Sequence, residues 1–132
     1  MRKFNTLLVA LLLIIVPMVV YYSMDQIAIL KPSLALSIPE ARARRFGLII
    51  DVRSPKEREE LGFYPNSIPI SLERLQKEVP MDISSKDTSI LVYSNGDYRA
   101  NKAADILYNM GYHKVRYISK PYLALMPGSS MQ

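Results

Sequence analysis

A chain of 132 residues is long enough for one domain and little more. It contains no cysteine, which excludes disulfides, thiolate nucleophiles and cysteine-bound metals, and its one histidine, His113, cannot build a metal site unaided. The 17 basic and 12 acidic residues give a net charge of +5, without the aromatic-studded basic stripe of nucleic-acid-binding proteins. We therefore expect no metal, no cofactor and no nucleic-acid partner.

The first predicted element is a membrane-spanning helix. Residues 4–22 are apolar with few interruptions, and about 20 such residues are enough to cross the hydrocarbon core of a bilayer. Tyr21 and Tyr22 stand where an interfacial aromatic belt would lie. Pro17 is tolerated in membrane spans although it would kink a soluble helix. We assign residues 1–23 to an uncleaved signal anchor that crosses the membrane once.

A cleaved signal peptide is the alternative for this segment, because Arg2 and Lys3 give it a charged start. The sequence at 20–23 offers no small-x-small cleavage site, so the anchor is preferred. Arg2 and Lys3 precede the span and Asp25 is the first charge after it. The positive-inside rule then leaves the N-terminus in the cytoplasm and places the soluble domain on the extracytoplasmic side.

Residues 24–36 are interpreted as a tether. Ser37 and Glu40 then form a capping box, in which the hydroxyl accepts from the third helical amide and Glu40 reaches back. The predicted helix continues to Phe46. Its basic cluster is interpreted as a solvated face, with contact to anionic lipid as the alternative: Arg42, Arg44 and Arg45.

The mostly apolar run at 48–52 suits a strand that is buried on both faces, hence a parallel sheet. A second capping box at 54–57 opens a short polar helix that ends near Leu61. A brief strand is expected over 68–70. Ser71 is expected to cap a further helix, whose apolar face holds Leu72, Leu75 and Val79.

Another buried strand is predicted over 90–93, and it leads into a polar loop at 94–99. The following helix carries apolar residues at helical spacing and ends at Gly111. One more strand is predicted at 115–118. Strands that alternate with helices, without internal repeats, indicate a single α/β domain over 37–128, with a mostly parallel central sheet flanked by helices.

This domain resembles the rhodanese family, whose motifs occur here in the same order. The run 49–53 is similar to the family's strand ending in D-V-R, and Glu57 follows at its acidic position. The strand at 90–93 and the loop that ends in Arg99 match the family's active-site strand, loop and loop arginine. Two further stretches match in part: Gly62, Pro65 and Ile70 in the G-H-I-P-G-A-x-x-I signature, and 103–115 in the A-A-x-x-L-x-x-x-G-F-x-x-V run.

The resemblance implies a sulfurtransferase-type loop, because four residues separate Ser94 from Arg99, whereas dual-specificity phosphatases have five there. Ser94 stands where the family has the cysteine that attacks a sulfur donor and holds a persulfide. A hydroxyl is a poor nucleophile without an activating base, and its oxygen cannot carry that persulfide. Because the chain holds no other cysteine, we expect no sulfur-transfer activity. Other departures are Phe63, Asn66 and Lys120-Pro121 in place of a histidine, a glycine and a late glycine pair.

The expected binding residues are those of the loop and of the neighbouring strand end: Ser94, Asn95, Gly96, Asp97, Tyr98, Arg99, Asp51 and Arg53. Loop amides and Arg99 favour an anion. Asp97 is interpreted instead as the cap of the following helix, with Arg99 as its structural partner, and Asp51 with Arg53 as a pair that braces the loop. His113 is expected at the far end of that helix, too distant to activate Ser94.

The sequence therefore predicts a membrane-anchored, catalytically inactive rhodanese-like module that binds a protein partner or a small anion. A rhodanese-type sulfurtransferase is the alternative, if the serine at the nucleophile position is not native.

Overall fold

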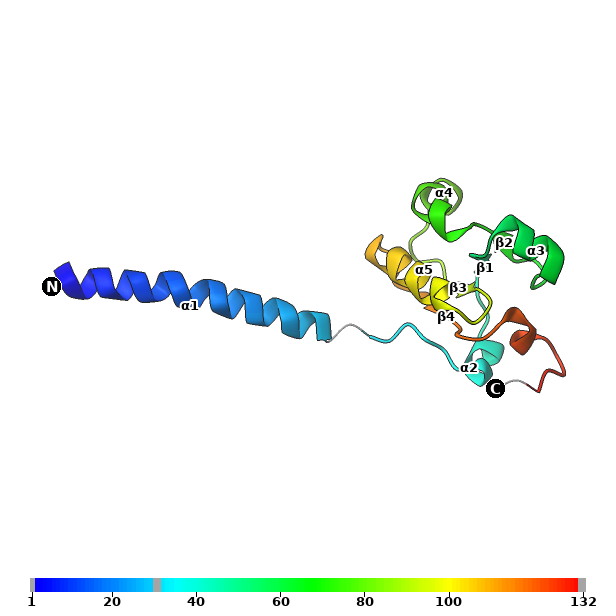
Figure 1. The fold of residues 1–132 in the computed structure, drawn as a ribbon, viewed down its shortest axis with the longest axis horizontal. Helices are drawn as coiled ribbons and strands as arrows, with labels where there is room; N and C mark the ends of the chain where they lie inside the picture. Colours follow the sequence, from blue (N-terminus) through cyan, green and yellow to red (C-terminus); the bar gives the residue numbers. More distant parts are fainter. Residues whose placement is uncertain (1, 30–31, 131–132) are drawn as a thin grey trace. The chain divides into compact units, whose positions relative to one another are not determined.

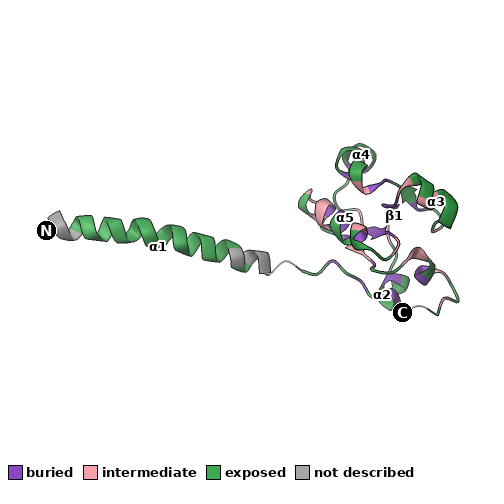
Figure 2. Cartoon of the chain, in the orientation of Figure 1, coloured by how far each residue is buried: buried purple, intermediate pink, exposed green. Residues whose placement is uncertain are grey.

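The computed structural model describes residues 2–29 and 32–130, and the chain forms two compact units, Met1–Ser33 and Leu34–Gln132. The first unit contains one helix, α1, Arg2–Ile29 (Figure 1). Its window Asn5–Met24 has a mean hydropathy of 2.5 and is exposed throughout (Figure 2). The predicted apolar helix is thus confirmed as one long and apolar enough to cross a membrane.

The second unit is an α/β domain, as predicted. Its four strands are all parallel and lie in the order β2-β1-β3-β4. The elements in chain order are α2, Ile38–Ala43; β1, Leu48–Asp51; α3, Pro55–Leu61; β2, Ile68–Pro69; the 3-10 turn η1, Leu72–Arg74; α4, Leu75–Asp82; β3, Ile90–Tyr93; α5, Tyr98–Asn109; β4, Val115–Tyr117; and the 3-10 turn η2, Tyr122–Leu125.

Helices cover both faces of the sheet, and this explains why β3 is apolar at every position. Ile90 and Val92 point into a core that α4 and α5 cover, whereas Leu91 and Tyr93 point into a second core under α2 and η2. All four of these residues are buried. Alternate residues of a strand face opposite sides, so a strand between two helical layers has no position left for a polar side chain.

The two predicted capping boxes are present. The amide of Glu40 donates to Ser37 Oγ at 3.3 Å, and the amide of Glu57 donates to Ser54 Oγ at 3.2 Å. In the first box the Ser37 hydroxyl also donates to Glu40 Oε1, at 2.9 Å. Each hydroxyl satisfies an amide that has no partner within its helix, which is why both helices begin where the sequence places them.

Two helix predictions are wrong in detail. α2 ends at Ala43 and not at Phe46, because Arg44 adopts an extended backbone and Phe46 packs against the second core. Ser71 is the N-cap residue of the 3-10 turn η1, which leads directly into α4, but its hydroxyl makes no capping bond. The hydroxyl accepts instead from Arg74 Nε at 3.0 Å, and Arg74 is the cap residue of α4. The packing of Phe46 therefore overrides the local helix pattern of α2, and the hydrogen bond from Arg74 takes the Ser71 hydroxyl that would have capped the helix.

The packed domain begins at Leu34, three residues before the boundary that the capping box suggests. Leu34 and Leu36 are buried, and they flank a parallel bridge from Ala35 to Tyr117 of β4. The amide of Leu36 donates to the Tyr117 carbonyl at 2.9 Å, and the amide of Tyr117 donates to the Leu34 carbonyl at 3.0 Å. The end of the expected tether thus pairs with the edge of the sheet. Residues 30–31, also within that tether, lie outside the described residues.

Candidate functional site

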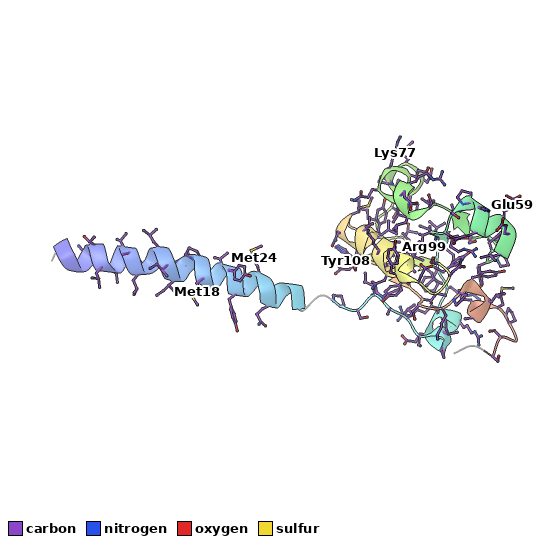
Figure 3. All side chains as sticks on the ribbon, viewed as in Figure 1. Met18, Met24, Glu59, Lys77, Arg99 and Tyr108 are labelled. Atoms are coloured by element: carbon purple, nitrogen blue, oxygen red, sulfur yellow. The ribbon has the colours of Figure 1, made fainter. Side chains whose placement is uncertain are left out.

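The candidate site lies at the edge of the sheet where β1 and β3 end. Asp51, the last residue of β1, is the register partner of Tyr93, the last residue of β3. Because parallel strands end at the same edge, Asp51 and the loop that starts at Ser94 lie side by side. The loop then enters α5, and Arg99 lies beside the start of that helix (Figure 3).

Ser94 is fully buried, and its hydroxyl is already engaged. Ser94 Oγ donates to Asp97 Oδ1 at 2.9 Å, and Asp97 Oδ1 also accepts from the Arg99 amide at 3.1 Å. Asp97 is the N-cap of α5, as predicted. One carboxylate oxygen therefore satisfies both the helix terminus and the serine hydroxyl.

Arg99 is held by two carboxylates. Its Nη2 lies 2.8 Å from Asp97 Oδ2, and its Nη1 and Nη2 donate to the two oxygens of Glu57 at 3.0 and 2.8 Å. The side-chain hydrogen bonds from Arg99 lower the pKa of Asp97 to about 2, and the bonds to Asp97 and Glu57 raise the pKa of Arg99. The predicted role of Arg99 as a structural partner of a loop carboxylate is confirmed.

The pair of Asp51 and Arg53 braces the loop from the other strand. Arg53 donates to Asp51 through Nε at 2.9 Å and Nη2 at 2.8 Å, with both side chains almost completely buried. Arg53 Nη1 also donates to Asn95 Oδ1 at 3.0 Å, and Asn95 Nδ2 donates to Glu57 Oε2 at 3.0 Å. Burial raises the pKa of Asp51, but the hydrogen bonds from Arg53 outweigh it, so the carboxyl's pKa is lowered.

The sequence reasoning left four residues of this network out of the site. Tyr93 donates to Asp51 Oδ2 at 3.2 Å, and its hydroxyl lies 2.9 Å from Ser67 Oγ. Arg58 Nη1 lies 3.2 Å from Asp51 Oδ2 and 3.0 Å from Ser67 Oγ. The fourth is Glu57, whose match to the family's acidic position was the available signal. For Tyr93, Arg58 and Ser67 the sequence carries no comparable signal.

Two predicted site residues stay outside the network. Gly96 has a φ of +82° in the left-handed region, and a Cβ there would lie 3.4 Å from Pro121 Cδ and from the Ser119 carbonyl oxygen, so it serves the tight turn of the loop. Tyr98 is 69% exposed, which places its ring on the surface around the loop. The remaining six predicted residues are joined by hydrogen bonds that run through Glu57.

In the described part of the chain, the Ser94 hydroxyl donates to a carboxylate, Asp97, and not to a histidine. Asp97, its hydrogen-bond partner, is a poor proton acceptor because its pKa is about 2. His113 follows the far end of α5, a helix of 12 residues that is about 18 Å long. Its ring lies 4.6 Å from the ring of Tyr108, centroid to centroid, and is tilted by 38° against it. Within the described part of the chain, no group of three or more histidine or acidic side chains is placed to hold a metal ion.

Comparisons with known proteins agree with this geometry. A model of the rhodanese-like domain matches residues 36–124. A Helicobacter pylori protein solved in solution is 27% identical, with a TM-score of 0.59 over 70% of this chain and 81% of that one. An Escherichia coli structure of a rhodanese with anions is 27% identical, with a TM-score of 0.50 over 53% and 81%.

A human single-domain sulfurtransferase has the same fold, with 20% identity and a TM-score of 0.60 over 76% of this chain and 99% of that one. No curated protein is similar enough to this chain to count as a match.

Proposed function

This chain belongs to the rhodanese-like domain family, and from that membership we propose that it is a membrane-anchored, catalytically inactive module that binds a protein partner. The observation that carries the proposal is the buried hydroxyl of Ser94, which donates to Asp97 where the family has its cysteine. Sulfur transfer needs a thiolate that attacks a donor and holds the transferred sulfur as a persulfide. An oxygen at that position supports neither step.

The charges around the loop argue against a small anion as the ligand. Three guanidinium groups lie in the network, and three carboxylates bind them: Arg53, Arg58 and Arg99 with Asp51, Glu57 and Asp97. Every buried side-chain nitrogen or oxygen atom of the described residues has a partner. A bound anion would meet the negative charge of these carboxylates beside the loop. The rhodanese from E. coli holds anions, but here Asp97 provides the negative charge itself.

Exposed apolar side chains around the loop support a protein partner instead. Tyr122 Oη donates to the Leu61 carbonyl at 3.3 Å, which brings η2 to the end of α3, and a bridge from Asn95 to Pro121 brings η2 to the loop. Large apolar residues stand on the surface of these three segments: Leu61, Phe63, Tyr98 and Leu123. Aromatic and apolar side chains around a fixed polar network form the kind of surface that protein interfaces bury.

Helix α1 supports the membrane anchor by its length and apolarity. Arg2 and Lys3 before the span favour a cytoplasmic N-terminus and an extracytoplasmic domain. We expect the full chain to stay in membranes washed with alkaline carbonate, and the domain to be digested by protease added to the extracytoplasmic side. Release by carbonate, or protection from that protease, would contradict the anchor or its orientation respectively.

The inactivity is tested with thiosulfate and cyanide as substrates and thiocyanate as the measured product. We expect the wild-type chain to give no product above background. Ser94→Cys should stay near background too, because the Asp97 carboxylate beside the new thiol raises its pKa and occupies the helix terminus that would stabilise a thiolate. Ser84→Cys, at an exposed position without a described partner, controls for the reactivity of any added thiol.

The alternative function, a rhodanese-type sulfurtransferase whose cysteine is replaced in this sequence, predicts a different result. Under that alternative, Ser94→Cys alone reaches the activity of an ordinary rhodanese measured in the same assay. Partner binding has its own test: a photo-crosslinker at Tyr98 should give one discrete adduct in native membranes, and the same group at Glu59, on the outer side of α3 (Figure 3), should not. Identical adducts from both positions would contradict a partner surface at the loop.

A further inference from the structure

A basic cavity lies at the other edge of the sheet from Ser94. It has a volume of about 280 Å³ and is lined by Arg44, Arg45, Phe46, Ser89, Lys114 and Arg116. Five of these residues come shortly before β1, β3 or β4, and Arg116 is the middle residue of β4, so the cavity lies near the start of these strands. We call this surface the amino-edge basic site. Four cationic side chains line it, and no carboxylate does.

The cations of this site are largely uncommitted within the described part of the chain. Arg45 and Lys114 are exposed, and their side chains make no described ion pair or hydrogen bond. Arg44 has only a long contact to Glu40, at 4.0 Å between exposed side chains. Arg116 donates through Nη1 to two backbone carbonyls. The cations of the amino-edge basic site thus differ from the guanidinium groups at the Ser94 edge of the sheet, each of which is bound by a carboxylate.

The neighbouring surface is apolar. A larger cavity of about 570 Å³ shares Arg44, Arg45 and Phe46 with the basic site, and most of its other lining residues are apolar: Ala41, Ile49, Leu91, Leu125 and Pro127. Positive charge next to apolar surface suits a ligand with an anionic head and an apolar body.

The chain enters the domain beside β4. Leu34 and Leu36 form backbone hydrogen bonds with Tyr117, the last residue of β4, and Arg116, which lines the basic site, precedes Tyr117. Only residues 30–33 separate the end of α1 from Leu34 along the sequence. A cationic surface on a domain that follows a membrane anchor so closely along the chain suits the head groups of anionic lipids.

We propose that the amino-edge basic site binds the phosphate head groups of anionic phospholipids in the membrane that holds α1. This inference rests on the proposed membrane anchor. Contact with the bilayer at this edge leaves the Ser94 loop and its apolar rim, at the other edge of the sheet, open to a partner.

The test uses the full chain in lipid nanodiscs, and its lack of cysteine allows labelling at a single introduced thiol. A donor fluorophore is placed at Asp87→Cys, an exposed position two residues before Ser89, or at Glu59→Cys on α3. Energy transfer to acceptor-labelled head groups is measured in phosphatidylcholine discs and in discs that also contain phosphatidylglycerol. We expect phosphatidylglycerol to increase the transfer from residue 87 more than that from residue 59.

The decisive variant is Arg45→Gln with Lys114→Gln, which removes two charges without breaking a described contact. Each lost charge should weaken docking about fivefold, so the pair should weaken it about 25-fold and bring the transfer to the level of phosphatidylcholine discs. Lys56→Gln with Lys102→Gln, both exposed and outside the basic site, makes the same change in net charge and should keep the transfer.

The inference is overturned if residue 87 gives equal transfer in both kinds of disc, or if the control pair loses the transfer as fully as the test pair. A carbonate wash of membranes that carry the chain tests separately whether α1 anchors the chain in the bilayer. A chain that resists the wash but shows no lipid dependence overturns the lipid contact alone. A chain that the wash removes overturns the anchor together with this inference.

Discussion

The substitution Asp51→Asn tests whether the buried charge pair holds the candidate site together. The Asp51 carboxylate accepts from the Arg53 amide at 3.0 Å, from Arg53 Nε at 2.9 Å and Nη2 at 2.8 Å, and from Arg58 and Tyr93 at 3.2 Å each. Asparagine keeps one acceptor oxygen for these five donors and turns the second oxygen into an amide that itself donates. It also leaves the Arg53 guanidinium, whose side chain is 0% exposed, without its counter-charge.

The expected cost is about 3–5 kcal/mol, the usual range when one partner of a buried ion pair is removed and the other charge stays buried. That is a large part of the roughly 5–15 kcal/mol by which a domain of this size is stable. The double variant Asp51→Asn with Arg53→Met should be less destabilised than Asp51→Asn alone, because it no longer buries an unpaired charge.

The measurement is urea unfolding of the full chain in detergent micelles, followed by near-ultraviolet circular dichroism of the buried tyrosines. With an m-value of about 1–2 kcal/mol/M, the midpoint should fall by about 1.5 M or more. Glu78→Gln is the matched control, since Glu78 pairs with Arg74 at 3.1 Å on the surface, and such a pair contributes about 1 kcal/mol or less. Equal losses for Asp51→Asn and Glu78→Gln would refute the role of the buried pair.

Two further predictions concern helix α5. The pKa of Asp97 is about 2 in the folded chain against 3.8 ordinarily, so the stability it contributes is fully present above about pH 4 and is lost as the pH falls toward 2. Asp97→Asn should flatten the dependence of the unfolding free energy on pH between about pH 4 and 2 relative to wild type, and parallel curves would contradict the role of the Asp97 carboxylate. Leu107→Ala, at a fully buried position of the first core, should cost about 2–5 kcal/mol in urea unfolding. Lys102→Ala, on the exposed face of α5, should change the stability by about 0.5 kcal/mol or less. Similar losses for the two variants would show that α5 does not pack as described.

Local patterns fixed the positions of most elements. The apolar runs at 48–52 and 90–93 became β1 and β3, and hydroxyl caps started α2 and α3 close to the predicted residues. The caps were predictable because a hydroxyl and the amide it satisfies lie within one turn of chain. The end of α2 was not, because Arg44 leaves the helical conformation and Phe46, two residues later, packs against residues distant in sequence.

In the candidate site too, contacts between residues close in sequence could be predicted, whereas contacts between distant residues could not. Asp97 and Arg99 lie within two residues of each other, so their cap and ion pair could be inferred from the loop sequence. Glu57 and Arg99 are separated by 42 residues, and no spacing rule states that they meet. The same holds for Tyr93 and Ser67, which meet because Ser67 precedes β2 and Tyr93 ends β3, and both of these strands pair with β1.

The sequence by itself determined that no thiol is available to the loop. A chain without cysteine can form no cysteine persulfide, whatever its fold, since composition does not depend on conformation. Only the tertiary structure decided which contacts the loop residues make instead. Strand order brings Glu57 and Asp97 onto the same arginine and leaves the basic residues at the opposite edge without carboxylates, because contacts across a sheet depend on which strands are neighbours and not on their distance along the chain.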